Sequence, residues 1–454
     1  MSAVPLSSAN PSDEPVSLGL APATAGLGWL GIARLGLVQA SLGAVVVLAT
    51  GALNRIMVLE MGLPALIPGL LIAWHYLIQV IRPRLGHGSD QGGRRTPWVV
   101  GGVFALALGA IGAAVATAVM ARHPLAGVLL AMVDYSLIGA GVGCAGTNLL
   151  VLLAQETAPS RRPAAATMAW IMMIVGFVLT TAIAGRMLDP YSPTRTLAVV
   201  ASVSAIALFT TLLAVLGIEP RRAPAVRPTG RPETAADDPA PDFGAALREV
   251  WAEPQARRFA SFVFLAMLAY SAQELLLDPF AGAVYGYSPG ASTRLSSYQH
   301  GGALLGMLLV AASGLWQVTR EVFSPRVSTL AGCVGSAALL GLLGLSAILH
   351  LGWSLPPVVF ILGVANGCFA VSAIAAMMQM VSQGARRREG VRMGLWGAAQ
   401  ALAFAAGGVT GTGLSDLARF WWQDPGLAYG LVFGLQGLLF LAAAGLARGL
   451  WPKG

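Results

Sequence analysis

The sequence predicts an all-α integral membrane protein with twelve transmembrane helices, arranged as two six-helix halves that repeat one plan. Composition is the first observation behind this prediction: the 454-residue chain is 56% hydrophobic and 11% charged, whereas a soluble domain is about 25% charged. The second is length, because twelve stretches approach the roughly 20 apolar residues that a helix needs to cross a bilayer. The third is an internal repeat, which is typical of transporter folds built from two halves.

The repeat is a pair of arginines that opens an apolar stretch and is followed, at fixed spacing, by a tryptophan and a glycine. Its two copies are Arg161-Arg162 with Trp170 and Gly185, and Arg387-Arg388 with Trp396 and Gly411. The predicted spans are, in chain order, 36–58, 65–81, 97–119, 126–154, 164–185, 196–217, 259–281, 297–318, 327–348, 356–380, 393–414 and 427–449. They divide the chain into an N-terminal half, 35–217, and a C-terminal half, 259–454.

Two segments lie outside the predicted halves. Residues 1–34 begin with sequence rich in Pro, Ser and Ala that lacks the basic stretch of a signal peptide, so a cytoplasmic tail is expected. Within it, Trp29 and Leu30 favour a short interfacial helix over 20–34. Residues 218–258 are rich in proline and charge and cannot bury a core, so a cytoplasmic linker is expected there.

The positive charges predict the orientation. When loops alternate between the two sides of the membrane, all but six of the 28 Arg and Lys residues fall on the side of the termini. Cytoplasmic loops are enriched in these residues, so both termini are expected in the cytoplasm. The same loops account for the net charge of +8, and no nucleic-acid partner is expected. The six exceptions are Arg55, Arg122, Arg186, Arg195, Arg294 and Arg419.

One predicted cytoplasmic loop carries a recognisable motif. It runs from Gly86 through Asp90 and Gly93 to Arg94 and Arg95, between the second and third spans. This loop resembles the signature of the major facilitator superfamily, Gly-x-x-x-Asp-x-x-Gly-Arg-Arg. Glycines permit a tight turn, an aspartate can cap a helix, and the arginines can pair with carboxylates as two halves move. The resemblance implies the major facilitator fold.

Ionisable residues at membrane depth are functional candidates, because burying them in lipid is costly. Tyr270, Glu274 and Asp278 are spaced by four and therefore share one face of the seventh span, and Asp134 lies in the fourth span. Two interpretations stay open for these residues: a polar cavity with a proton-coupling carboxylate, or groups that only form hydrogen bonds between helices.

A second polar group lies at the outer end of the first span. It consists of Asn54, Arg55 and Glu60, and it is equally able to line a cavity or to act as a structural clamp.

Two histidines, His75 and His300, occupy roughly equivalent positions in the two halves. A neutral imidazole in apolar surroundings is a good axial ligand for the magnesium of a chlorin, and it is also a common hydrogen-bonded packing residue. Both interpretations stay open. The sequence shows no nucleotide-binding loop, metal-ligand cluster or nucleophile triad, so neither an enzyme nor a metal site built from protein ligands is expected.

Four stretches of sequence are distinctive: Gly28 to Gln39, Leu53 to Glu60, Leu77 to Asp90, and Arg94 to Trp98. They resemble the PucC family of light-harvesting assembly proteins of phototrophic bacteria, and in particular the branch encoded among bacteriochlorophyll-synthesis genes. The resemblance implies a factor in the bacterial inner, photosynthetic membrane that assembles light-harvesting complexes containing bacteriochlorophyll.

The same resemblance implies partners and a bound group. The partners are light-harvesting antenna polypeptides, bacteriochlorophyll-synthesis enzymes and membrane lipid. The family's link with pigment, joined to the comparable positions of His75 and His300, makes bacteriochlorophyll the candidate bound group, with His75 or His300 as its candidate ligand.

The superfamily fold leaves a second hypothesis open. A proton-coupled secondary transporter of a hydrophobic or tetrapyrrole-related molecule would show the same spans, with Glu274 or Asp134 carrying the proton. The near absence of charge within the spans favours a hydrophobic cargo over a sugar or an ion.

Overall fold

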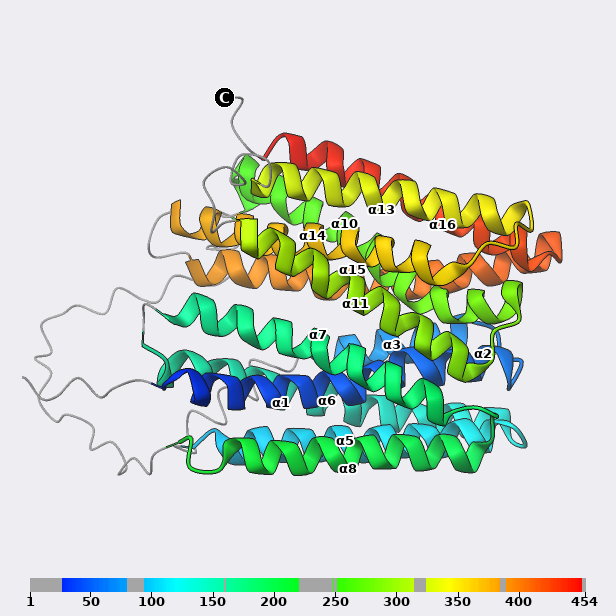
Figure 1. Ribbon diagram of the computed structural model, residues 1–454, viewed down its shortest axis with the longest axis horizontal. Helices are drawn as coiled ribbons and strands as arrows, with labels where there is room; N and C mark the ends of the chain where they lie inside the picture. The colour runs from blue at the N-terminus through cyan, green and yellow to red at the C-terminus, as the bar shows by residue number, and fades with distance from the viewer. Residues whose placement is uncertain are drawn as a thin grey trace, which may run out of the picture.

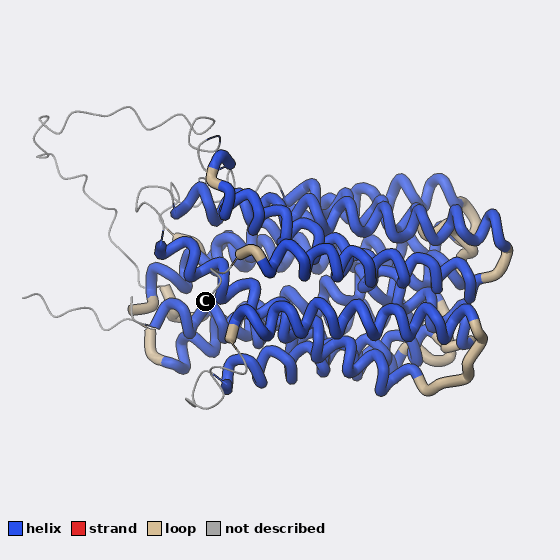
Figure 2. The backbone as a smooth tube through the Cα atoms, turned by 90° about the horizontal axis from the view of Figure 1, so that it is seen from above, coloured by secondary structure: helices blue, strands red, loops and turns tan. Residues whose placement is uncertain are grey.

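The computed structural model describes residues 27–79, 94–158, 161–219, 248, 251–313, 324–383 and 389–450. Within these ranges every regular element is a helix, and they contain no strand. The long helices run side by side along one axis, as Figure 1 and Figure 2 show from two directions. Helices suit a bilayer because each satisfies its backbone hydrogen bonds within its own segment.

The N-terminal half contains six crossings. The first is built from three consecutive pieces, α1 (Trp29–Val47), the π-helical turn η1 (Leu48–Ala52) and α2 (Leu53–Leu59). The other five are α3 (Leu66–Ile78), α5 (Thr96–Met120), α6 (Pro124–Glu156), α7 (Arg162–Met187) and α8 (Pro193–Val215). Their buried apolar side chains form one core, which runs from Ile32 to Ile218 and also takes in Leu275 of the other half.

The C-terminal half contains six more crossings and lies above the first half in Figure 1. They are α10 (Pro254–Tyr285), α11 (Pro289–Ser313), α13 (Pro325–Ile348), α14 (Leu355–Gln383), α15 (Glu389–Trp422) and α16 (Pro425–Arg448). A second core runs from Phe259 to Leu450. Most of these helices begin with proline, whose missing N–H is not needed in a first turn. The predicted fold class, twelve crossings in two sets of six, is confirmed in the described residues.

Nine helices of the described part are long and apolar enough to span a membrane. The other three crossings are the short helix α3 and the more polar helices α11 and α15. These three lie at the boundary between the halves, where α15 packs on α3 and α11 packs on α7. Several polar residues of α11 and α15, such as Ser292, His300 and Thr412, are therefore buried in protein and not exposed to lipid, which removes the cost of exposing them to hydrocarbon.

Several limits differ from the sequence prediction. Helix α11 begins at Pro289 instead of 297, because its polar first turns find partners inside the protein. The predicted interfacial helix over 20–34 is not separate in its described part, since Trp29 already opens α1, whose apolar sequence continues into the membrane. Residues 1–26 and 220–247 lie outside the described residues, so the tail and linker stay predictions.

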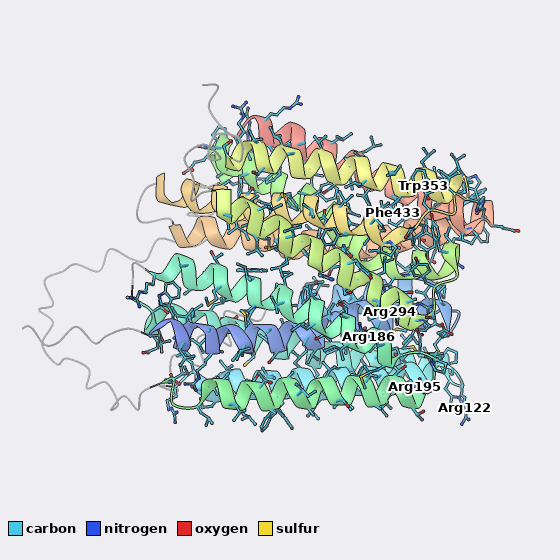
Figure 3. The ribbon with its side chains drawn as sticks, viewed as in Figure 1. Arg122, Arg186, Arg195, Arg294, Trp353 and Phe433 are labelled. Carbon is cyan, nitrogen blue, oxygen red and sulfur yellow. The ribbon has the colours of Figure 1, made fainter. Side chains whose placement is uncertain are left out.

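Helix α1 begins and helix α16 ends on the same side of the bundle (Figure 1), called here the terminal end; the opposite side is called the far end. Four of the six exceptional arginines, Arg122, Arg186, Arg195 and Arg294, lie toward the far end (Figure 3). These four arginines therefore lie at the end of the bundle at which the sequence predicts them, opposite to the start of α1.

Candidate functional site

Arg55, in α2, is the centre of a polar cluster that joins the two halves. Its Nη1 atom lies 2.6 Å from Glu60 Oε1, Nη2 donates to the backbone oxygen of Tyr287 at 2.7 Å, and Nε donates to Ser292 Oγ at 3.1 Å. Gly282 leaves space for this side chain, since a Cβ there would lie 3.0 Å from Nη2. Arg55 is 4% exposed, and a buried charge is tolerated only when it is paired. Glu60 supplies the opposite charge, and the hydrogen bonds to Tyr287 and Ser292 tie the first half to the second.

Asn54 supplies a hydrogen bond that a proline removes from a helix of the other half. Pro279 lies inside α10 and has no N–H, so the carbonyl oxygen of Leu275, four residues earlier, lacks its helical donor. The Nδ2 group of Asn54 donates to that oxygen at 2.7 Å. An unsatisfied carbonyl at membrane depth costs several kcal/mol, so this contact is a second polar fastener between the halves.

Asp278 lies between α10, α11 and η1. It is 2% exposed, and its Oδ1 atom accepts a hydrogen bond from Ser296 Oγ at 2.7 Å. Its Oδ2 atom faces Gly51 of η1, where a Cβ would stand 3.2 Å away. The turn is π-helical because the N–H of Leu53 donates to the oxygen of Leu48, five residues earlier. Such turns are frequent at functional sites. This one places Gly51 of the first half against the buried carboxylate of Asp278 in the second half.

His300 and Glu274 continue the polar cluster toward the middle of the bundle. The Nδ1 atom of His300 lies 2.8 Å from the backbone oxygen of Ser296, and its Nε2 atom lies 3.7 Å from Glu274 Oε1. The ring of Phe177, from α7, packs edge-on at 4.9 Å between centroids. His300 is 2% exposed, so residues of both halves enclose it.

A small pocket between the halves reaches Glu274. Its lining comes from the first half (Thr50, Ile72, Tyr76) and from the second half (Ser271, Glu274, Leu275, Phe404). Its volume of about 10 Å³ has room for about one water molecule. The rings of Tyr76 and Tyr270 lie 5.1 and 6.1 Å from the ring of Phe404, measured between centroids. The predicted face of α10 is therefore turned toward the other half.

Asp134 belongs to a different place. Its carboxylate packs against Gly112 of α5, inside the first half, and its Oδ2 atom is buried without a hydrogen bond from the described residues. The neighbouring Tyr135 donates its hydroxyl to the oxygen of Ala49 in η1 at 2.8 Å. The structure does not bring Asp134 together with the cluster around Glu274.

His75 also lies inside the first half. Its Nε2 atom is 2.9 Å from Gln79 Nε2, and the backbone oxygen of His75 packs directly on α6, 2.5 Å from where a Cβ of Gly139 would stand. His75 and His300 are each 2% exposed, so the macrocycle of a chlorin reaches neither ring without a change in packing. The two histidines occupy comparable points of the halves but have different surroundings.

The signature loop is described only at its end, because Gly86, Asp90 and Gly93 lie outside the described residues. The guanidinium of Arg95 is directed inward, and its Nε donates to Gln155 Oε1 at 3.0 Å.

Glu219, at the end of the first half, accepts hydrogen bonds from the first residue of α5 and from the residue before it. Its carboxylate accepts hydrogen bonds from the backbone N–H groups of Arg95 and Thr96 at 2.8 and 2.9 Å and from the Thr96 hydroxyl at 2.8 Å, with Arg94 Nε at 4.0 Å. Burial alone would raise the pKa of Glu219, but these hydrogen bonds and the charge of Arg94 outweigh it and lower the pKa. Glu219 therefore caps α5 as a carboxylate.

Two aspartates that the sequence analysis did not single out form hydrogen bonds between the halves at the far end. Asp189, after α7, accepts from the backbone N–H of Gly290 at 3.0 Å and caps the start of α11. Asp416, on α15, accepts from the N–H groups of Ala65 and Leu66 at 2.9 and 2.7 Å and caps the start of α3. Each contact joins one half to the other. The sequence does contain a signal for both residues: Asp189 closely follows Gly185 of the first copy of the repeat, and Asp416 closely follows Gly411 of the second copy.

Comparison with known proteins gives relatives over the whole bundle. A family model described as PUCC protein matches residues 52–453. The chain is 50% identical over 430 residues to the bacteriochlorophyll synthase 44.5 kDa chain of Rhodobacter capsulatus, covering 93% of this chain and 96% of that protein. It is 27% identical over 426 residues to protein PucC of Cereibacter sphaeroides, covering 90% and 89%.

Solved structures share the architecture at low identity. The nucleoside transporter NupG matches with a TM-score of 0.66 and 13% identity, covering 93% of this chain and 99% of that one. A bacterial homologue of the human drug peptide transporters PepT1 and PepT2 matches with a TM-score of 0.67 and 15% identity, covering 93% and 97%. At these identities the likeness shows the fold alone, and it confirms the predicted major facilitator fold.

Proposed function

The chain belongs to the PUCC protein family, and on that premise we propose that it is a membrane assembly factor for light-harvesting complexes that contain bacteriochlorophyll. The observation that carries the proposal is 50% identity, over 93% of the chain, to a protein named as a bacteriochlorophyll synthase chain. The relatives named PucC support the same family role.

The proposed role is that of a scaffold and not of a catalyst. The polar residues between the halves are engaged mainly with one another and with backbone groups, which suits a structural joint. The outer surface carries many exposed apolar side chains, and in a multi-pass membrane protein these are available to lipid and to single-span antenna polypeptides. Bacteriochlorophyll-synthesis enzymes are the second class of partner in this proposal.

The proposed location is the bacterial inner membrane, including its photosynthetic part, with both termini in the cytoplasm. The support is the distribution of arginines in the sequence, together with the position of four of the six exceptions, Arg122, Arg186, Arg195 and Arg294, toward the far end. Cytoplasmic loops carry the excess of Arg and Lys.

Purification from phototrophic cells tests the assembly role. The tagged protein is extracted in mild detergent, its absorption spectrum is recorded, and co-purified peptides are identified by mass spectrometry. We expect light-harvesting polypeptides in excess over a tagged, unrelated multi-pass protein from the same cells. Equal recovery with both proteins would overturn the proposal.

The ligand role of His75 and His300 stays a prediction, which the same preparation tests. Pigment per protein is compared between wild type, His75→Leu and His300→Leu. Loss of bacteriochlorophyll in one variant identifies the ligand, whereas equal pigment in all three removes both residues from pigment binding.

A proton-coupled transporter is the second candidate, and the position of Glu274 at a pocket between the halves favours it. In vesicles containing the purified protein, uptake of a fluorescent tetrapyrrole would then be saturable, driven by a pH gradient and lost in Glu274→Gln. Uptake that equals that of empty vesicles excludes this candidate for that cargo.

A further inference from the structure

The protonation of His300 is constrained by its neighbours. A backbone carbonyl can only accept a hydrogen bond, so the 2.8 Å contact between His300 Nδ1 and the oxygen of Ser296 requires a hydrogen on Nδ1. In the neutral imidazole, Nε2 then carries the lone pair. This Nε2 atom is buried and has no hydrogen-bond partner among the described residues.

The group that faces this lone pair is a carboxylate. Glu274 Oε1 lies 3.7 Å from His300 Nε2, and both atoms are acceptors when His300 is neutral and Glu274 is ionised. Two acceptors that face each other away from bulk water repel each other, and neither is satisfied. One added proton reverses this, because it produces either an imidazolium beside a carboxylate or a carboxylic acid beside an imidazole.

We propose that His300 and Glu274 together form a binding site for one exchangeable proton, which is reached from the pocket between the halves. Glu274 lines that pocket and its side chain is 23% exposed, whereas the His300 side chain is 3% exposed. The proton therefore arrives from water in the pocket by way of the glutamate. Only O–H and N–H bonds change, and no other reactant is needed. This inference does not depend on the assembly role.

The charged and titratable groups around the pair come from α10, α2, α3 and α14. Asp278, one turn after Glu274 on α10, interacts with both members of the pair, and Arg55 on α2 is the cation that acts on this aspartate. Tyr270 on α10 and Tyr76 on α3 lie on the pocket side, and Cys368 on α14 contacts α11 beyond His300. Helix α7 presents the apolar ring of Phe177.

Proton occupancy changes the charge at the boundary between the halves. With the proton the pair is neutral overall, and without it the pair carries one negative charge. An uncompensated charge in an apolar interface requires water, so loss of the proton favours hydration of the pocket and separation of the halves there. The proton is thus a ligand that stabilises the closed arrangement of the middle of the bundle.

Nitrogen NMR of the histidines in lipid nanodiscs tests the site. The chain has five histidines, and the signals of His300 are identified by their loss in His300→Gln. In wild type we expect Nδ1 to keep its hydrogen throughout the range from about pH 5 to 9, while Nε2 gains a proton as the pH falls. In Glu274→Gln the midpoint of this change moves to lower pH by about one unit or more, because the negative charge that stabilises the imidazolium is gone.

Two further variants make the result decisive. Asp134→Asn removes another buried membrane carboxylate that lies apart from the pair, and it leaves the midpoint unchanged. Glu274→Ala also removes the charge and is expected to lower the midpoint as Glu274→Gln does, which covers the case in which Glu274→Gln does not fold. The proposal is overturned by an Nε2 signal that does not titrate, or by a midpoint that is the same in wild type and in every folded Glu274 variant.

Discussion

At the scale of single residues, the halves are fastened through backbone groups more than through side-chain pairs. Asn54 reaches the oxygen of Leu275, and Arg55 reaches the oxygen of Tyr287. The sequence predicts that these residues form a polar cluster, but it does not predict which carbonyl each one meets, because the partner depends on the rotation of two helices. One clue is nevertheless present: Pro279 deprives Leu275 of its donor, so some other donor is required there.

A double-mutant cycle measures this contact. Asn54→Ala leaves the oxygen of Leu275 unsatisfied and is expected to destabilise the protein by about 1–3 kcal/mol. In a Pro279→Ala background the N–H of residue 279 serves that oxygen, so the same Asn54→Ala change is expected to cost much less. Thermal unfolding in detergent gives the four stabilities. Equal losses in the two backgrounds would show that Asn54 acts through some other contact.

At the scale of elements, acidic residues from distant helices cap three helix starts. Glu219 caps α5, Asp189 caps α11 and Asp416 caps α3. Helix existence and approximate limits follow from apolar length and from the prolines in first turns, so the sequence predicts them well. The caps do not follow from local sequence, because each donor and its acceptor are brought together only by the packing of separate helices.

Glu219 makes the stability of the terminal end depend on pH. Its pKa in the folded protein lies below the ordinary value of 4.5, so its contribution is complete above pH 4.5 and is lost as the pH falls through the lowered pKa. We expect Glu219→Gln to be less stable than wild type by about 1 kcal/mol at neutral pH, with the difference shrinking in acid. Glu253→Gln is the control, because Glu253 is the N-cap residue of α10 and its side chain makes no capping hydrogen bond there. A difference that stays constant down to the acid end would contradict this assignment.

The two aspartates at the far end are expected to hold it closed. Each cap is worth about 0.5–2 kcal/mol, so Asp189→Ala with Asp416→Ala should shift the equilibrium toward an open far end. Spin labels at Arg122→Cys and Trp353→Cys, one on each half, report the separation in a background without the native cysteines. Asp424→Ala removes a cap within one half and is the matched control. A distance distribution identical to the control would show that the caps do not set this equilibrium.

At the scale of the whole molecule, composition and the internal repeat are enough to predict the fold. A bilayer admits helices as the only spanning form for such sequence, and apolar length then gives their number and order. Apolar length does not say which helices meet. The three crossings without a long apolar window, α3, α11 and α15, all contact the other half. Low apolarity in a long predicted span, as in α11 and α15, is therefore a sign of an internal face.

The π-helical turn η1 gives the first crossing two independent orientations. Helix α1 packs on α7 and α8 of its own half, whereas α2 packs on α10 of the other half. A turn that closes on the fifth residue holds one residue more than an α-helical turn, and each residue corresponds to a rotation of about 100°. Deleting one residue there would turn Asn54 and Arg55 away from the carbonyls they now reach. A length difference of one residue in this segment would therefore mark relatives whose halves are joined through a different set of side chains.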